Sequence, residues 1–251
     1  MYNFPEGFTI GGVSNSSLSL IVLDKEVPLM PPISNQDEDA PGMDGAHDFG
    51  VKYDPKIIPV KVQVLGAESK ADYNNKLRNL ATKLNPRIGA KPLIFADEPD
   101  KQYYARLSET FDPSRMGLIS SIFTLSFICH DPFTYAVTEK EVSFTSGSKM
   151  IVHEGGHVAK PILYITKGAG AAAIKLTRPD STTQIIKFTA DAPGGVYALD
   201  CKAETALQGT EGAYKYLEEE QYFGMYPGSN VISVESGSVS SVRVVYRDTW
   251  L

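Results

Sequence analysis

The sequence is poor in cysteine and histidine and has no excess of positive charge, and each shortage excludes a class of protein. Its 251 residues include 2 cysteines and carry a formal net charge of −6. Two cysteines as far apart as Cys129 and Cys201 do not make the disulfide framework of a small secreted domain. We expect both to be reduced, buried thiols of a protein made in a bacterial cytoplasm, with a disulfide between them as the minor alternative. Without a Lys/Arg-rich tract, nucleic acid is excluded as a main partner.

Long apolar segments are also missing. No run approaches the roughly 18 residues that a membrane-spanning helix needs. The first residues, MYNFPEGFTIGG, lack the cationic start and apolar core of a signal peptide. We therefore expect neither a membrane span nor a secretion signal.

Residues suited to catalysis are scarce. Of the 4 histidines, His47 lies in an acidic stretch and His130 at a strand end, where turn and surface roles are commoner than that of a general base. No G-x-S-x-G elbow is present. Paired carboxylates such as Glu218-Glu219-Glu220 belong to charge runs typical of solvated loops. The sequence predicts no enzyme, no catalytic residue and no cofactor.

One segment, His153-Glu154-Gly155-Gly156-His157, matches the H-E-x-x-H pattern of zinc metalloproteases. That chemistry needs a helix, because only i, i+4 spacing on one helical face brings both imidazoles onto one zinc. Two adjacent glycines cost a helix interior roughly 2 kcal/mol relative to alanine, whereas they suit a turn between strands. The sequence favours the turn, and no bound metal is expected.

A second segment, Gly168-Ala169-Gly170-Ala171-Ala172-Ala173, imitates a dinucleotide-binding fingerprint. The fingerprint works only when a helix N-terminus follows it. Here the alternating, β-branched Ile174–Thr177 follows, so we expect a glycine-rich hairpin loop and no nucleotide.

The first half of the chain predicts a sheet and one helix. Residues 57–65 and 119–129 alternate between apolar and polar, as half-buried strands do, and Pro59 suggests that the first of them lies near an edge. Between them, Tyr73, Leu77, Leu80, Ala81 and Leu84 recur at helical spacing, which predicts a helix over about 69–84 that lies across a sheet.

The second half is β in texture throughout. Short strands are expected at 161–166, 172–177, 184–189, 195–200, 231–235 and 240–247, separated by turn residues at near-regular spacing. This pattern is typical of an antiparallel sandwich. We place a domain boundary near Tyr135, giving domains 1–135 and 136–251.

Two segments predict surface features that bind a partner. Residues 25–48 hold prolines, glycines and clustered acids without periodicity, so we expect a long, partly exposed loop that is a candidate interface arm. Residues 91–107 predict a strand, the tight turn Asp97-Glu98-Pro99-Asp100, and a second strand.

Five blocks in order resemble the distal tail protein (Dit) family of long-tailed bacteriophages. Pro41-Gly42-Met43-Asp44-Gly45 is similar to the family's Gly-Arg-Asp-Gly turn, with Met43 where arginine is common. The strand and helix over 57–84 follow in family order. The remaining three blocks are Phe95, Asp97, Glu98, Pro99, Asp100, Tyr103 or Tyr104 and Ala105, then Pro161–Ile165, and last Phe223–Ile232.

The resemblance implies a mainly β protein without enzymatic activity. An N-terminal split β-barrel or sandwich with one helix would form a hexameric ring at the virion tail tip, followed by a galectin-like antiparallel β-sandwich. The ring would join the tail tube protein to a tail-associated lysin or fibre protein, with receptor-binding proteins as a further partner. The acids of 35–48 and of the turn would then be candidate subunit or tube contacts, or else ordinary solvated loops. These candidates are Asp37, Glu38, Asp39, Asp44, Asp97, Glu98 and Asp100.

An alternative remains open. A galectin-like shape does not entail sugar binding, but a carbohydrate-binding adhesin that contacts the host cell wall fits the same fold. The lone Trp250 more often closes a core or an interface than it offers a sugar platform.

Overall fold

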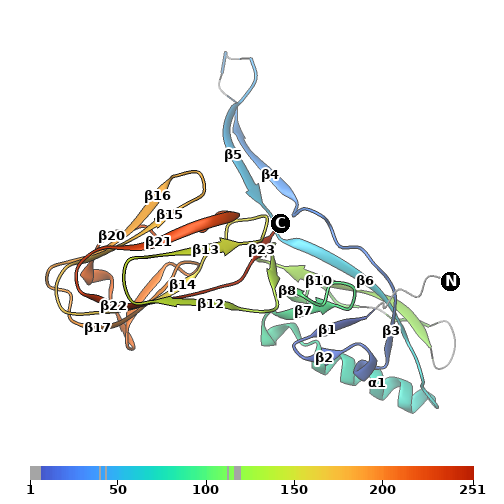
Figure 1. Ribbon diagram of the computed structural model, residues 1–251. Helices are drawn as coiled ribbons and strands as arrows, with labels where there is room; N and C mark the ends of the chain where they lie inside the picture. Colours follow the sequence, from blue (N-terminus) through green and yellow to red (C-terminus); the bar gives the residue numbers. More distant parts are fainter. Residues whose placement is uncertain (1–6, 40, 43, 112, 116–119) are drawn as a thin grey trace. The chain divides into compact units, whose positions relative to one another are not determined.

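The computed structural model describes residues 7–39, 41–42, 44–111, 113–115 and 120–251 (Figure 1). Met43 and Ile119, which belong to segments interpreted above, lie outside these residues. The chain forms two compact units, residues 1–134 with Leu251 (unit 1) and residues 135–250 (unit 2). Each has its own apolar core. No helix in the described part of the chain is long and apolar enough to cross a membrane.

Unit 1 is built on one mainly antiparallel sheet. Its strands follow the order β2-β1-β7-β8-β10-β6-β3, and β9 pairs with β10. Because this path ends at β2 and β3, the described sheet is open rather than a closed barrel. The strands are β1 (Phe8–Ile10), β2 (Val13–Ser14), β3 (Leu20–Lys25), β6 (Lys56–Val64), β7 (Lys91–Phe95), β8 (Lys101–Leu107), β9 (Ser114–Arg115) and β10 (Ser121–Cys129).

Alternation along β6 and β10 places the core of unit 1 as the sequence predicted. Ile58, Val60, Val62 and Val64 are each at most 1% exposed, and Leu125 and Phe127 oppose them from β10. The prediction that Pro59 marks an edge is wrong, because β6 pairs with both β10 and β3. Pro59 lies just beyond Lys25↔Val60, the last residue pair between β3 and β6. There its carbonyl oxygen accepts a hydrogen bond from Glu26 N–H, and the missing N–H of proline costs no ladder bond to β3.

The predicted helix is confirmed as α1 (Lys70–Lys83). Ser69 caps it by accepting a hydrogen bond from Asp72 N–H at 3.1 Å. Tyr73, Leu80 and Leu84 are buried in the core of the sheet, whereas Ala81, predicted on the same stripe, is exposed. A short 3₁₀ helix, η2 (Pro86–Ile88), follows, because proline cannot continue the α-helix.

The predicted long loop over 25–48 is wrong. Most of it belongs to a two-stranded antiparallel hairpin of β4 (Ile33–Glu38) and β5 (His47–Tyr53), which pairs with no other strand among the described residues. Figure 1 shows this hairpin, here called the arm, projecting from unit 1. An isolated two-stranded hairpin is marginally stable in water by itself.

Unit 2 is a two-sheet antiparallel sandwich, as predicted. One sheet has the order β12-β22-β14-β17-β18-β19 and the other β13-β21-β15-β16-β20. The strands are β12 (Lys140–Phe144), β13 (Ser148–His153), β14 (Ile162–Lys167), β15 (Ala172–Thr177), β16 (Thr183–Phe188), β17 (Gly195–Asp200), β18 (Thr205–Gln208), β19 (Glu211–Gly212), β20 (Leu217–Glu220), β21 (Gly228–Ser236) and β22 (Val239–Tyr246). A further short strand, β23 (Thr249–Trp250), pairs with β11 (Thr134–Ala136) and belongs to neither of these sheets. Side chains from both sheets, such as Leu163 and Ile174, form one core. The strand β11 crosses the unit boundary.

The two cysteines are free and buried, as predicted. Burial raises the pKa of both thiols to about 12. At pH 8 only about one such thiol in ten thousand is ionised, so we expect a disulfide reagent to label the native protein far more slowly than the protein in guanidinium chloride. Equal labelling rates in the two conditions would contradict this burial.

Candidate functional site

The metalloprotease-like segment is not helical. His153 is the last residue of β13, and residues 155–157 form a bend. The turn predicted from the two glycines is therefore confirmed. His153 itself is 1% exposed, which the sequence did not indicate.

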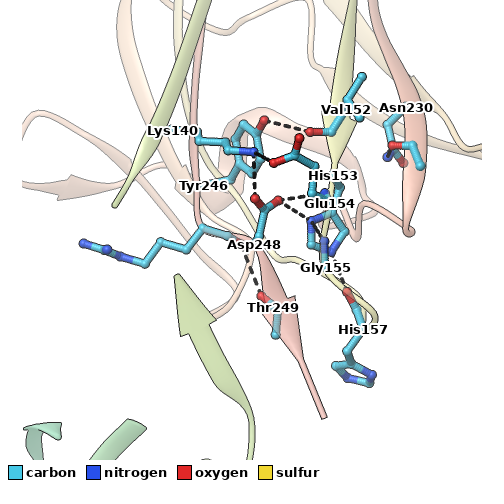
Figure 2. A network of polar contacts seen from close by, with 12 residues as sticks. Lys140, Val152, His153, Glu154, Gly155, His157, Asn230, Tyr246, Asp248 and Thr249 are labelled. Atoms are coloured by element: carbon cyan, nitrogen blue, oxygen red, sulfur yellow. Dashed lines mark hydrogen bonds and ion pairs between the residues drawn. The ribbon is translucent and has the colours of Figure 1, made fainter. Parts of the chain in front are cut away.

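A polar network that reaches the surface through Lys140 and Glu154 surrounds the buried His153 (Figure 2). Nδ1 of the ring lies 2.7 Å from Oδ1 of Asp248, and Nε2 lies 2.6 Å from the carbonyl oxygen of His157. Lys140 pairs with Oδ2 of Asp248 at 2.7 Å and with Glu154 at 2.5 Å. The network thus ties β12, the end of β13 and the segment after β22 to one carboxylate.

The charges of the network stabilise one another. Partial burial raises the pKa of Asp248. Hydrogen bonds from Lys140, His153 and Glu154 N–H outweigh this effect and hold that pKa below its usual value. Hydrogen bonds to Asp248 and Glu154 raise the pKa of Lys140. Both partners therefore stay ionised at neutral pH.

The backbone packs tightly at the same place. A Cβ built on Gly155 would lie 2.1 Å from the carbonyl oxygen of Thr249 and 2.5 Å from Cε1 of His153. His157 N–H donates to the same Thr249 carbonyl at 2.9 Å. Gly155 is thus needed for its lack of a side chain, which lets two backbone segments approach.

This arrangement suits a structural clamp rather than a metal centre. A zinc ligand needs a free lone pair on a ring nitrogen, and both nitrogens of His153 face oxygen atoms instead. Among the described residues, no three His, Cys, Asp or Glu side chains gather as metal ligands.

The glycine-rich segment 168–173 joins β14 to β15 with no helix after it. The predicted hairpin is wrong in detail, because β14 and β15 belong to different sheets. The segment is a connection between the two layers of the sandwich.

Four of the predicted interface residues lie on the arm. Asp37 and Glu38 end β4, and Asp39 and Asp44 lie at the tip, all of them exposed. The apolar residues beside them were not predicted as surface features, because the segment was expected to be a loop. Large exposed side chains here are Leu29 (93%), Met30 (49%), Ile33 (53%), Phe49 (68%) and Val51 (58%).

The other three predicted residues lie in the turn between β7 and β8. The predicted strand-turn-strand is confirmed by the pairing Lys91↔Ala105 through Leu93↔Tyr103. Asp97 forms an ion pair with Lys25, and Glu98 forms one with Lys101 at 2.7 Å. Both acids thus already have partners within the chain. Asp100 is exposed.

The chain is similar in sequence to phage tail proteins. Residues 16–129 match the model of the phage tail protein RIFT-related domain. The distal tail protein of Bacillus phage SPP1 is 25% identical over 194 residues, which cover 75% of either chain.

Two solved structures share the fold over nearly the whole chain. The crystal structure of SPP1 Dit, described as a paradigm of the hub adsorption apparatus in phages that infect Gram-positive bacteria, superposes with a TM-score of 0.80 at 18% identity and covers 98% of this chain and 99% of that one. A chain of the phage P2 baseplate in its activated conformation with Ca superposes with a TM-score of 0.54 at 10% identity and covers 97% and 98%.

Proposed function

We propose that the chain, which is similar to the siphophage distal tail proteins, is a structural component of the phage tail and forms the hexameric ring hub of the tail tip. In this proposal the ring joins the tail tube protein to the tail-associated lysin or fibre protein and to receptor-binding proteins. The observation that carries it is the sequence match to a distal tail protein over most of both chains. The protein would act by assembly and would catalyse no reaction.

The arm supports an assembly role. Monomeric proteins rarely expose contiguous large apolar side chains, and unpaired strand edges invite contact with another chain. On the arm, Phe49 and Val51 are more than half exposed and neither strand has a second partner among the described residues. We propose that Asp37, Glu38, Asp39 and Asp44 form part of a subunit or tube contact, and that Asp97, Glu98 and Asp100 are secondary candidates.

Two aromatic residues of unit 2 are arranged less well for sugar binding. Sugars stack on open aromatic faces, but Arg243 lies 4.0 Å from the ring centre of Tyr164 and Arg178 lies 4.3 Å from that of Tyr226. Each guanidinium occupies a ring face. This arrangement favours the structural hub over the adhesin alternative.

Solution mass tests the proposal directly. We expect light scattering of the purified chain to give six copies, and negative-stain images to show closed rings with a central hole. A preparation that stays monomeric up to the highest soluble concentration would contradict self-assembly into a ring. Binding of isolated host cell-wall polysaccharide by that monomer would instead support the adhesin.

A further inference from the structure

Unit 1 contains a small open cleft whose charge is opposite to that of the arm. The cleft is shallow, with a volume of about 10 Å³, and lies where the end of α1 meets β7 and β8. Its charged lining residues are Lys83, Lys91 and Arg106, and no carboxylate is among the described residues that line it. In a chain of net charge −6, three cations without an acidic neighbour in one cleft are unexpected.

The three cations of the cleft are available for a partner. Among the described residues, no carboxylate pairs with Lys83, Lys91 or Arg106. Arg106 is oriented by two contacts, from Nη1 to the carbonyl oxygen of Leu107 at 3.1 Å and from Nη2 to Nε2 of His130 at 2.8 Å. A guanidinium that is already held in place loses little conformational freedom when it binds an acid.

The arm carries the complementary charge and does not use it locally. In the described part of the chain, Asp37, Glu38, Asp39 and Asp44 are exposed and form no ion pair. No residue of the arm lines the cleft of its own chain. The two surfaces therefore remain for contact between different copies.

We propose that Asp39 and Asp44, at the tip of the arm, pair with Lys83, Lys91 and Arg106 at the cleft of a neighbouring copy. This inference rests on the proposed function and names the contact that would build the ring. Each copy donates one arm and receives another, which is a head-to-tail contact of the kind that closes into rings. The apolar residues of the arm become covered in the same step, and opposite charge at the tip fixes register and partner choice.

Charge reversal tests this contact with pairs of substitutions. The cleft-reversed variant carries Lys83→Glu and Lys91→Glu, and the arm-reversed variant carries Asp39→Lys and Asp44→Lys, both outside the arm strands. A matched control, Lys61→Glu with Lys70→Glu, reverses two exposed cations of unit 1 that do not line the cleft. Sedimentation velocity at low salt gives the concentration at half-assembly of each protein.

We expect each reversed variant to need about tenfold or more protein for half-assembly, while the control stays near the wild type. Mixing the two reversed variants in equal amounts should restore assembly, because acidic arms then meet basic clefts and basic arms meet acidic clefts in alternation. Such alternation closes only in rings with an even number of copies, so six is compatible.

The outcomes separate this inference from the proposed function. Rings that form normally from the cleft-reversed variant, or reversed variants that fail to rescue each other on mixing, would overturn the arm-to-cleft contact and leave the ring in place. A wild-type chain that forms no ring at all would overturn both.

Discussion

The Asp248→Asn variant is expected to lose about 2–3 kcal/mol of unfolding free energy, because hydrogen bonds to a charged group contribute about 1.5–3 kcal/mol and buried donors would lose their acceptor. Asp248 and His153 have side chains that are 4% and 0% exposed, so water cannot replace the lost hydrogen bond between them. Lys140 is one-third exposed and keeps its ion pair with Glu154. Most of the lost free energy therefore comes from the hydrogen bond between Asp248 and His153. Urea unfolding followed by the fluorescence of Trp250, the single tryptophan and a residue of unit 2, measures this loss near its source.

A control and the pH dependence sharpen this test. Glu219→Gln removes an exposed ion pair with Lys187 and should cost no more than about 1 kcal/mol. Because the folded pKa of Asp248 is lowered, its contribution is present above about pH 4 and is lost as the pH falls through the folded value. The gap between wild type and Asp248→Asn should therefore narrow in acid. If Asp248→Asn lost no more unfolding free energy than Glu219→Gln, the network around Asp248 would not stabilise unit 2 as proposed.

The second large effect is expected from adding one methyl group. Gly155→Ala should destabilise unit 2 by about 3 kcal/mol, at the upper end of the usual cost of overpacking, because the new Cβ would meet backbone atoms of Thr249. Backbone atoms cannot move aside as the end of a flexible side chain can.

The neighbouring glycine supplies the control. A Cβ on Gly156 would meet only Cδ1 of Trp250 at 3.8 Å, which is ordinary contact. Gly156→Ala should therefore change stability by no more than about 0.5 kcal/mol, as most substitutions without a named mechanism do. Equal unfolding free energies for the two variants, again by urea unfolding, would show that the close approach at Gly155 is not the constraint.

Where one face of an element is buried, the sequence predicted the fold well. The strand over 56–64 alternates because one face meets the core, and the helix at 70–83 carries a matching stripe. The arm was missed for the same physical reason. Neither face of ISNQDE or HDFGVKY is buried in unit 1, so no period of two is imposed on these residues.

The polar clamp shows a different limit. The two glycines of the His153–His157 segment were enough to reject a helix, since propensity is a local property. The pairing of His153 with Asp248 joins residues that are 95 positions apart. Nothing in the local sequence around Arg247-Asp248-Thr249 distinguishes its acid from the many exposed ones, and only the folded topology brings the two together.

The same topology determines when unit 2 can become stable during synthesis. Its early strands β12 and β13 take β22 and β21 as their sheet partners, and the clamp needs Asp248. A ribosome must therefore release nearly all of unit 2 before its first two strands find their partners. The strands on the path from β2 to β3 of the unit 1 sheet, and β9 beside them, all lie before residue 130, so this part of the sheet can form while unit 2 is still being translated. A nascent chain stalled near residue 220 should thus present a folded first unit and a second unit that chaperones and proteases still recognise as unfolded.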